Sequence, residues 1–250
     1  MVKKCEIETK SGKVQGYIGE GLEIFKGIPF AEPPVGDLRF KAPVEKKSWN
    51  DVFDASSYGF CPFQGDSPIW TLWSKPEPES EDCLNLNVWT PATDGKMRPV
   101  MFWIYGGSFK TGSGIETMYD GSHLAKRGDV VIVTINYRLS SLGFLNVPGS
   151  TVNVGLLDQV AALQWVQDNI KAFGGDPNNV TIFGESAGAM SVCMLSAMPA
   201  AKGLFNRVIA QSTAIIRAAT TNTSGVASKR LMRSLGLRKG DVEGLRKIPA

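Results

Sequence analysis

The chain has 250 residues, of which 43% are hydrophobic and 20% charged, and its formal net charge at pH 7 is +3. This is the composition of a globular protein with enough apolar residues for a real core. The small net charge gives no electrostatic reason to expect a nucleic-acid partner. No apolar run approaches the length of a membrane-spanning helix, so we expect no membrane span.

The first twenty residues, MVKKCEIETKSGKVQGYIGE, predict a strand, a turn at Ser11-Gly12 and a second strand. They include basic residues, but the apolar segment of a secretory signal peptide does not follow. We therefore expect a cytoplasmic protein, or a secreted one if the true N-terminus is missing. The chain up to residue 95 is rich in turns, and we expect it to supply antiparallel strands at one edge of a sheet.

Three short apolar runs further along the chain are typical of strands that are covered on both faces. They are PVMFWIY at 99–105, DVVIVTINY at 129–137 and NVTIFG at 179–184, and NRVIAQS at 206–212 is a fourth candidate strand. Between the second and third runs, apolar residues recur at helical spacing from Leu156 to Ile170, and Gly174-Gly175 ends the helix. This alternation predicts a mostly parallel sheet with helices on both faces. Two small helices with polar faces are predicted in the last 25 residues.

The sequence contains four cysteines and one histidine: Cys5, Cys61, Cys83, Cys193 and His123. The cysteines do not have the spacing of a metal-binding motif, and four of them in a chain of this length do not make a disulfide scaffold. We therefore expect no metal site. His123 lies in YDGSHLAKRGD, between two predicted strands, and we expect it to be a surface or helix residue.

Ser186 lies between two glycines in TIFGESAGAM, directly after a predicted strand and directly before residues typical of a buried helix. The Gly-x-Ser-x-Gly pattern alone is a weak signal, but its place between a strand and a helix is that of a nucleophile elbow. Such a sharp turn presses Gly184 and Gly188 against each other, so side chains would clash there. The serine backbone is strained, and its hydroxyl points out from the top of the sheet. A structural turn with an incidental serine is the alternative.

A glycine-rich loop, YGGSFKTGSG, follows the predicted strand at 99–105. Both this loop and the serine turn come at the carboxyl ends of parallel strands, where open α/β sheets bind ligands. Backbone N–H groups in such a loop can stabilise the negative charge that acyl transfer places on a carbonyl oxygen. An ordinary strand-end turn is the alternative.

Long segments of the sequence resemble the type-B carboxylesterase family, the α/β-hydrolases that include cholinesterases and bacterial nitrobenzyl-type esterases. The segments are FKGIPFAEPPVGDLRFKAP at 25–43, SEDCLNLNVWTP at 80–91, NYRLSSLGFL at 136–145, the long stretch at 153–191 around Ser186, and AKGLFNRVIAQS at 201–212. The resemblance implies an α/β-hydrolase fold with a mostly parallel central sheet and antiparallel N-terminal edge strands. It places residues 1–250 in the N-terminal part of a single domain.

The resemblance also implies roles for individual residues. By position, Ser186 resembles the nucleophile, and the N–H groups of Gly107, Ser108 and Ala187 resemble the oxyanion hole. Ser108 departs from the three-glycine run that is usual in the family, so we expect a narrowed pocket and, if φ is positive there, strain of about 1 kcal/mol or more. Glu185 resembles the glutamate beside the nucleophile, with a satisfied buried carboxylate as the alternative.

The same resemblance implies three structural pairs. Cys61 and Cys83 match a disulfide of the family, although a reducing cytosol would keep them as thiols. Arg39 with Glu81 and Arg138 with Asp158 match two partly buried ion pairs. Trp73 lies near the position of a choline-binding tryptophan. For Trp73 we prefer an apolar wall or an ordinary loop anchor to a cation–π role.

In this fold the nucleophile is followed along the chain by an acid and then by a histidine. Here His123 precedes Ser186, and the only carboxylates after the serine are Asp241 and Glu243. The sequence therefore resembles the N-terminal half of a longer enzyme, truncated before its acid and base. We also expect 206–212 to be an unpaired sheet edge with exposed apolar surface, and the chain to be poorly soluble.

We interpret the protein as a carboxylic ester hydrolase by ancestry, which acts on small-molecule esters through an acyl-enzyme. The resemblance implies no cofactor, and without a base we expect little turnover from these residues. A non-catalytic cholinesterase-like binding module is the main alternative, and a transferase or lyase on the same fold is another.

Overall fold

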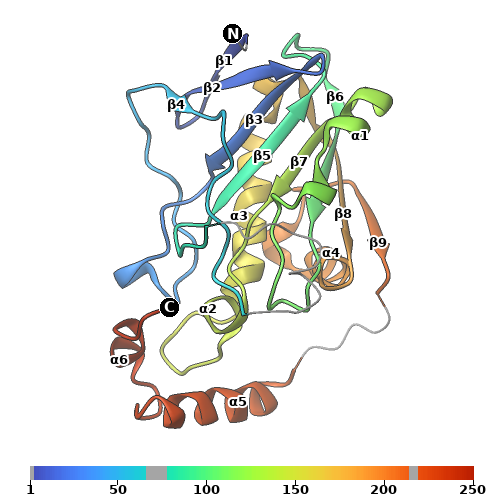
Figure 1. The fold of residues 1–250 in the computed structure, drawn as a ribbon. Coiled ribbons are helices and arrows are strands. Elements are labelled where there is room, and N and C mark those ends of the chain that lie inside the picture. Colours follow the sequence, from blue (N-terminus) through green and yellow to red (C-terminus); the bar gives the residue numbers. More distant parts are fainter. Residues whose placement is uncertain (1–2, 66–77, 214–218) are drawn as a thin grey trace.

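The computed structural model describes residues 3–65, 78–213 and 219–250, and Figure 1 shows a twisted sheet with helices against it and two further helices to one side. The strands are β1 (Lys4–Thr9), β2 (Gly12–Gly19), β3 (Leu22–Pro29), β4 (Phe53–Asp54), β5 (Asn85–Thr90), β6 (Arg98–Ile104), β7 (Val131–Ile135), β8 (Gly175–Glu185) and β9 (Arg207–Gln211). The α-helices are α1 (Ser122–Gly128), α2 (Ser140–Phe144), α3 (Val154–Asn169), α4 (Ala187–Ala197), α5 (Thr221–Ser234) and α6 (Val242–Arg246). Short 3-10 helices are η1 (Gly36–Leu38), η2 (Thr117–Tyr119), η3 (Ile170–Phe173) and η4 (Pro199–Ala201).

The strand order in the sheet is β1-β2-β3-β5-β7-β6-β8-β9, and β4 pairs with β2. Antiparallel pairing joins β1, β2, β3, β5 and β7, whereas parallel pairing joins β7, β6, β8 and β9. The three apolar runs and the fourth candidate strand of the sequence are the four parallel strands. The predicted parallel core with antiparallel N-terminal strands is therefore confirmed, and the hairpin at Ser11-Gly12 joins β1 to β2.

Helices cover both faces of the sheet, as Figure 1 shows for α1 and α3. Ile132 and Val133 are neighbours on β7, so their side chains point to opposite faces. Ile132 packs in a cluster with Ala125 of α1. Val133 belongs to the main core, which includes Leu163 and Val166 of α3. The central strands are thus buried on both sides, which is why their sequences are almost continuously apolar.

The last strand, β9, lies at the end of the sheet, and all five of its residues are exposed. Val208 and Ile209 are 39% and 44% exposed. The predicted open edge with apolar surface is therefore present in the structure. Among the described residues, no helix has both the length and the apolar character that crossing a lipid bilayer requires.

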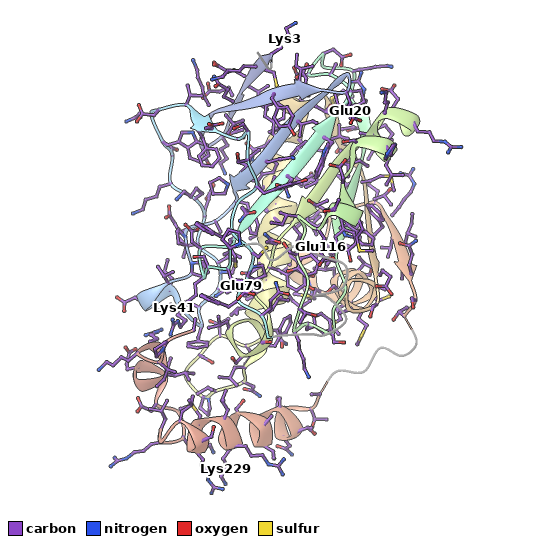
Figure 2. The ribbon with its side chains drawn as sticks, in the orientation of Figure 1. Lys3, Glu20, Lys41, Glu79, Glu116 and Lys229 are labelled. Carbon is purple, nitrogen blue, oxygen red and sulfur yellow. The ribbon has the colours of Figure 1, made fainter. Side chains whose placement is uncertain are left out.

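The helices α5 and α6 pack against the body through a small apolar cluster, separate from the main core. It contains Phe40, Val147, Met232, Val242 and Leu245. The opposite side of α5 is polar, and Figure 2 shows Lys229 pointing away from the body. The two polar-faced helices that the sequence predicts are therefore present, and each buries one apolar stripe.

Candidate active site

Ser186 stands in the sharp turn between β8 and α4. Its backbone has φ 54° and ψ −117°, in a region that non-glycine residues rarely adopt. A Cβ on Gly184 would lie 2.6 Å from the carbonyl carbon of Gly188, and a Cβ on Gly188 would collide with the carbonyl oxygen of Ile104. Both glycines are therefore required by close contact, as the sequence predicts.

The glycine-rich loop after β6 comes close to this turn. In the parallel pairing of β6 with β8, Ile104 is opposite Gly184, so the next residues of both strands leave the sheet side by side. A Cβ on Gly106 would lie 3.1 Å from the Cβ of Ser186. The structure thus brings together the two segments that the sequence singles out, and Ser186 is only partly buried.

The loop itself has an unusual backbone. Gly107 has φ 101°, and Ser108 and Phe109 both have φ 58°. The carbonyl oxygen of Gly107 accepts hydrogen bonds from the N–H groups of Lys110 (3.0 Å) and Thr111 (3.1 Å). The left-handed conformation that Ser108 was expected to need is therefore present, at a cost of about 1 kcal/mol or more.

Asn136, which sequence reasoning did not single out, anchors the far end of the loop. It is buried after β7, and its Oδ1 accepts hydrogen bonds from Ser113 Oγ (3.0 Å) and from the N–H of Gly114 (2.8 Å). Its Nδ2 donates to the carbonyl oxygen of Phe60 (3.0 Å). Its position just after a buried apolar run was the only signal in the sequence, because a buried amide at a strand end must find partners.

The other residues that the sequence analysis proposes for the site differ in their burial and in their place in the fold. Ala187 is the first residue of α4 and is buried. Glu185 is exposed, so the alternative that it is a satisfied buried carboxylate is wrong. A Cβ on Gly106 would lie 2.8 Å from its Oε2, so its carboxylate lies beside the glycine loop. His123 is exposed on α1, as expected. Trp73 lies outside the described residues.

A second carboxylate, Glu116, lies in the loop between β6 and α1, and Figure 2 shows it near the middle of the molecule. It is partly buried, and one of its oxygens accepts a hydrogen bond from the N–H of Ser113 (3.1 Å). Burial raises the pKa of Glu116 above its ordinary value. Burial also raises the pKa of Tyr119, whose ring packs against Trp103 at 5.1 Å. No pattern in the sequence indicates this cluster.

Comparison with known proteins agrees with this geometry. The Carboxylesterase family model matches residues 3–249. The chain belongs to the carboxylesterase family. It is 48% identical to the para-nitrobenzyl esterase of Bacillus subtilis (strain 168) over 249 residues, which is 98% of this chain and 50% of that protein. It is also 50% identical to the acetylcholinesterase of Electrophorus electricus over 224 residues, 82% of this chain and 35% of that protein.

Solved structures of the carboxylesterase family superpose closely on the chain. A thermophilic PNB esterase gives a TM-score of 0.92 at 45% identity, and a Geobacillus stearothermophilus carboxylesterase gives 0.89 at 45% identity. Each comparison covers 98% of this chain and 51% of the other. The chain therefore has the α/β-hydrolase architecture of these esterases. It spans about half the length of the para-nitrobenzyl esterase and of the solved esterase structures, consistent with the N-terminal half.

Two ion pairs support this carboxylesterase scaffold below the candidate site. Arg138 donates from Nη2 to Asp158 Oδ1 at 2.6 Å and from Nε to Oδ2 at 2.8 Å, and both side chains are buried. Arg39 donates from Nε to Glu81 Oε2 at 2.6 Å. Both predicted pairs are confirmed. Arg39 also donates to the carbonyl oxygen of Arg246 (2.9 Å), so it connects to α6 as well.

The two cysteines that the family resemblance pairs, Cys61 and Cys83, are both buried thiols, and the structure contains no disulfide between them. Cys61 Sγ donates to Ser113 Oγ at 3.3 Å, so it contributes to the polar contacts below the loop. Burial raises the pKa of Cys83 well above its ordinary value. A buried thiol with a raised pKa is a weak nucleophile, so Cys83 is not a candidate for chemistry at the site.

A cavity of about 500 Å³ lies between α2, α5 and α6. Six of its seventeen lining residues are leucines, and the lining includes Ser140 and Gln64, which contact the loop after β6, but not Ser186. The candidate carboxylesterase-like site is therefore the turn at Ser186 together with the loop after β6, at the carboxyl ends of β8 and β6, and not this cavity.

Proposed function

We propose that the chain carries the nucleophile and the oxyanion hole of a carboxylic ester hydrolase. Ser186 Oγ attacks the carbonyl carbon of a small-molecule ester and forms the acyl–oxygen bond, while the alkoxy oxygen leaves with a proton. Water then cleaves the acyl-enzyme and releases the carboxylic acid. Membership of the carboxylesterase family supports this reaction class.

One observation carries the proposal: a strained serine faces a glycine loop. The φ of Ser186, 54°, costs about 1–3 kcal/mol, and such strain persists where the surrounding structure imposes it. Here the N–H of Ser186 donates to the carbonyl oxygen of Gln211 at 2.9 Å, which fixes the turn against β9. An incidental serine would not require this conformation.

The oxyanion hole is proposed to consist of the N–H groups of Gly107, Ser108 and Ala187. Ala187 is at the N-terminus of α4, where the first N–H groups have no partner within the helix. Gly107 and Ser108 follow Gly106, which lies against Ser186. Each such donor contributes about 3–4 kcal/mol of transition-state stabilisation where this has been measured.

These 250 residues contain one imidazole, His123, which is exposed on α1, and α1 packs against β5 and β7. We therefore assign no general base to the chain and expect slow acylation and little turnover. Because the para-nitrobenzyl esterase is 48% identical, para-nitrobenzyl esters are reasonable first substrates.

The proposal is tested with a fluorophosphonate probe, followed by intact-protein mass spectrometry. We expect one slow adduct, on Ser186, that forms faster as the pH rises because no base removes the serine proton. Ser186→Ala should abolish it, and Ser196→Ala, which changes an exposed serine of α4, should not affect it. A cooperatively melting chain that forms no adduct within a day would instead favour a non-catalytic binding module.

A further inference from the structure

Two tyrosines that the proposed chemistry does not use lie directly below the glycine loop. Tyr105 and Tyr137 follow β6 and β7, and both are fully buried. Their rings stack with centroids 4.5 Å apart at an angle of 20°. Each hydroxyl donates to the other residue's backbone: Tyr137 Oη to the Tyr105 carbonyl at 3.1 Å, and Tyr105 Oη to the Tyr137 carbonyl at 3.3 Å.

The Tyr105 carbonyl lies where the loop and the elbow meet. A Cβ on Gly188 would be 2.9 Å from its oxygen, so this oxygen lies against the first turn of α4. A Cβ on Gly112 would be 2.6 Å from Cδ2 of the Tyr105 ring, so the loop returns across that ring. The hydroxyl of Tyr137 therefore holds a peptide group that lies against both the loop after β6 and the first turn of α4.

That peptide group is the one whose N–H belongs to Gly106. A peptide unit is planar, so a hydrogen bond to its oxygen fixes the orientation of the whole unit. The next residues, Gly106 and Gly107, are glycines, whose backbone has the widest freedom of any residue. An anchor immediately before them limits where the N–H groups of Gly107 and Ser108 can point.

We propose that Tyr137 is a positioning residue for the oxyanion hole, acting through the carbonyl of Tyr105. This inference rests on the proposed function of the loop. The hydroxyl of Tyr105, in contrast, holds the peptide after Tyr137. That segment meets the loop only beyond Ser108, where the N–H of Ser140 donates to the carbonyl oxygen of Phe109 at 2.8 Å. The two hydroxyls are therefore alike in burial and in bonding but differ in what they position.

Both hydroxyls remain donors over the working range of an esterase. Burial raises the pKa of Tyr105 and of Tyr137 well above that of an exposed tyrosine. The arrangement therefore does not change with pH between about 5 and 9, because an unperturbed tyrosine already titrates near 10.

The test compares Tyr137→Phe with Tyr105→Phe as a matched control, since each variant removes one buried oxygen and keeps the ring stack. The first measurement is the fluorophosphonate reaction at several probe concentrations. We expect Tyr137→Phe to lower the limiting rate constant about tenfold and to leave the half-saturating probe concentration unchanged. The expected loss of rate is smaller than the 10²–10³-fold loss that follows removal of an oxyanion-hole donor itself. Tyr105→Phe should stay within about twofold, although both variants lower the melting temperature similarly.

The second measurement is amide hydrogen exchange at Gly107 and Ser108, which needs no reaction at the serine. We expect faster exchange in Tyr137→Phe only. Equal behaviour of the two variants in both measurements would overturn the positioning role. If the unchanged chain does not react with the probe, the proposed function fails, whereas the exchange comparison still decides what Tyr137 positions.

If Tyr137→Phe does not melt cooperatively, both variants are compared in a Gly225→Ala background. Gly225 lies in α5, and a Cβ there would meet no atom within 4 Å, so this substitution is expected to stabilise the helix. A difference between the two variants in that background supports the inference, and its absence overturns it.

Discussion

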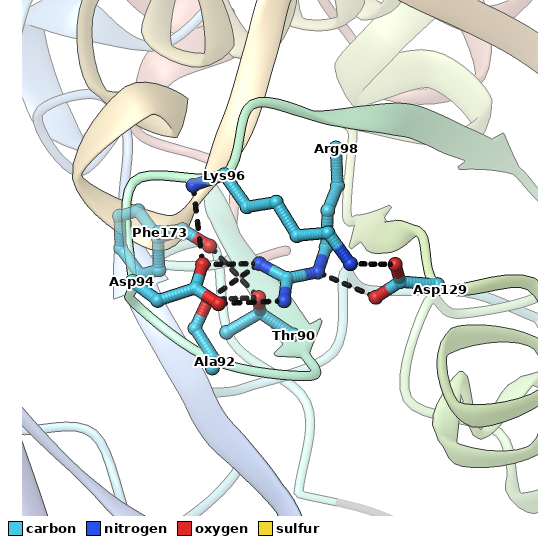
Figure 3. Close-up of polar contacts among 7 residues, drawn as sticks. All are labelled: Thr90, Ala92, Asp94, Lys96, Arg98, Asp129 and Phe173. Atoms are coloured by element: carbon cyan, nitrogen blue, oxygen red, sulfur yellow. Dashed lines mark hydrogen bonds and ion pairs between the residues drawn. The ribbon is translucent and has the colours of Figure 1, made fainter.

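The two ends of the central strands β6 and β8 are built in opposite ways. At the carboxyl ends, glycines and left-handed residues bring the backbone of the loop after β6 against the partly exposed Ser186. At the amino ends, side chains tie neighbouring segments together, as Figure 3 shows around Arg98. Arg98 is 6% exposed; it donates from Nη1 to Asp94 at 2.6 Å and from Nε to Asp129 at 2.6 Å.

The amino end also connects distant parts of the chain. The N–H of Arg98 donates to the carbonyl of Gly174 (2.8 Å), and Thr90 Oγ1 donates to the carbonyl of Phe173 (2.8 Å). The loop before β6, the end of α1 and the segment before β8 thus meet at one arginine. The comparison teaches that a charged, buried side chain joins the segments at the amino end, whereas close backbone contact between glycines joins the loop and the turn at the carboxyl end, where we propose that the ligand binds.

Gly188→Ala should have the largest effect, because its Cβ would collide with the Ile104 carbonyl and force apart α4 and β6. We expect a loss of about 3 kcal/mol or more in the free energy of unfolding, and loss of labelling at Ser186. Gly225→Ala, in open space on α5, should instead gain about 0.5–1 kcal/mol. Urea unfolding measures both. An unchanged midpoint in Gly188→Ala would show that the turn does not depend on close contact.

Arg98→Met should lower the free energy of unfolding by about 1–3 kcal/mol, since a buried residue loses its charge-assisted hydrogen bonds. Because these bonds are at the amino end of β6, the labelling rate of Ser186 should stay within about twofold of the unchanged chain's under folded conditions. The measurements are thermal unfolding and probe kinetics below the transition. A strong loss of labelling in the folded variant would show that the two ends are coupled.

Ser108→Gly should change stability by only about 0.5 kcal/mol, because relief of strain at φ 58° is offset by the greater chain entropy of glycine. Labelling should become roughly a few-fold faster, since removal of the exposed Ser108 side chain should widen the narrowed pocket that we expect at this loop. Ser108→Ala keeps a Cβ and is the control. Equal rates for the glycine and alanine variants would contradict crowding at this position.

Asp94→Asn tests the amino end through its pH dependence, with the smallest expected effect. Hydrogen bonds from Arg98 lower the pKa of Asp94 below its ordinary value. A carboxyl whose pKa is lower in the folded than in the unfolded state stabilises the fold fully above about pH 4. This stabilisation is lost as the pH falls through the folded-state pKa. The variant should therefore be less stable at pH 7, with a difference that shrinks from about pH 4 towards pH 2. A difference that is constant with pH in urea titrations would exclude this origin.

Much of the fold could be predicted from local patterns. The apolar runs that became β6, β7 and β8 predicted buried strands because their residues are apolar on both sides of the pleat, whereas the run that became β9 is an exposed edge strand. Gly174, with φ 77°, ends the segment after α3 as its position predicts. The glycines beside Ser186 could be recognised because close backbone contact excludes every other residue type.

What could not be predicted are contacts between segments distant in sequence. Tyr105 and Tyr137 are 32 positions apart, and nothing in either local sequence shows that each hydroxyl reaches the other's carbonyl. The same holds for Arg98 and Asp129, and for the exposure of Glu185. Charged and aromatic side chains are compatible with many environments, so their partners depend on how strands and loops are finally placed.

The sequence by itself determined the order of the elements, the strand–turn–helix around Ser186 and the need for glycine on both sides of it, because these depend on the periodicity and sterics of adjacent residues. Only the tertiary structure decided that Gly106 lies against Ser186, that Ser108 adopts a positive φ, and which side chains fasten the opposite end of β6. Those features require the parallel register of β6 with β8, which brings together residues about 80 positions apart, and no local pattern specifies that register.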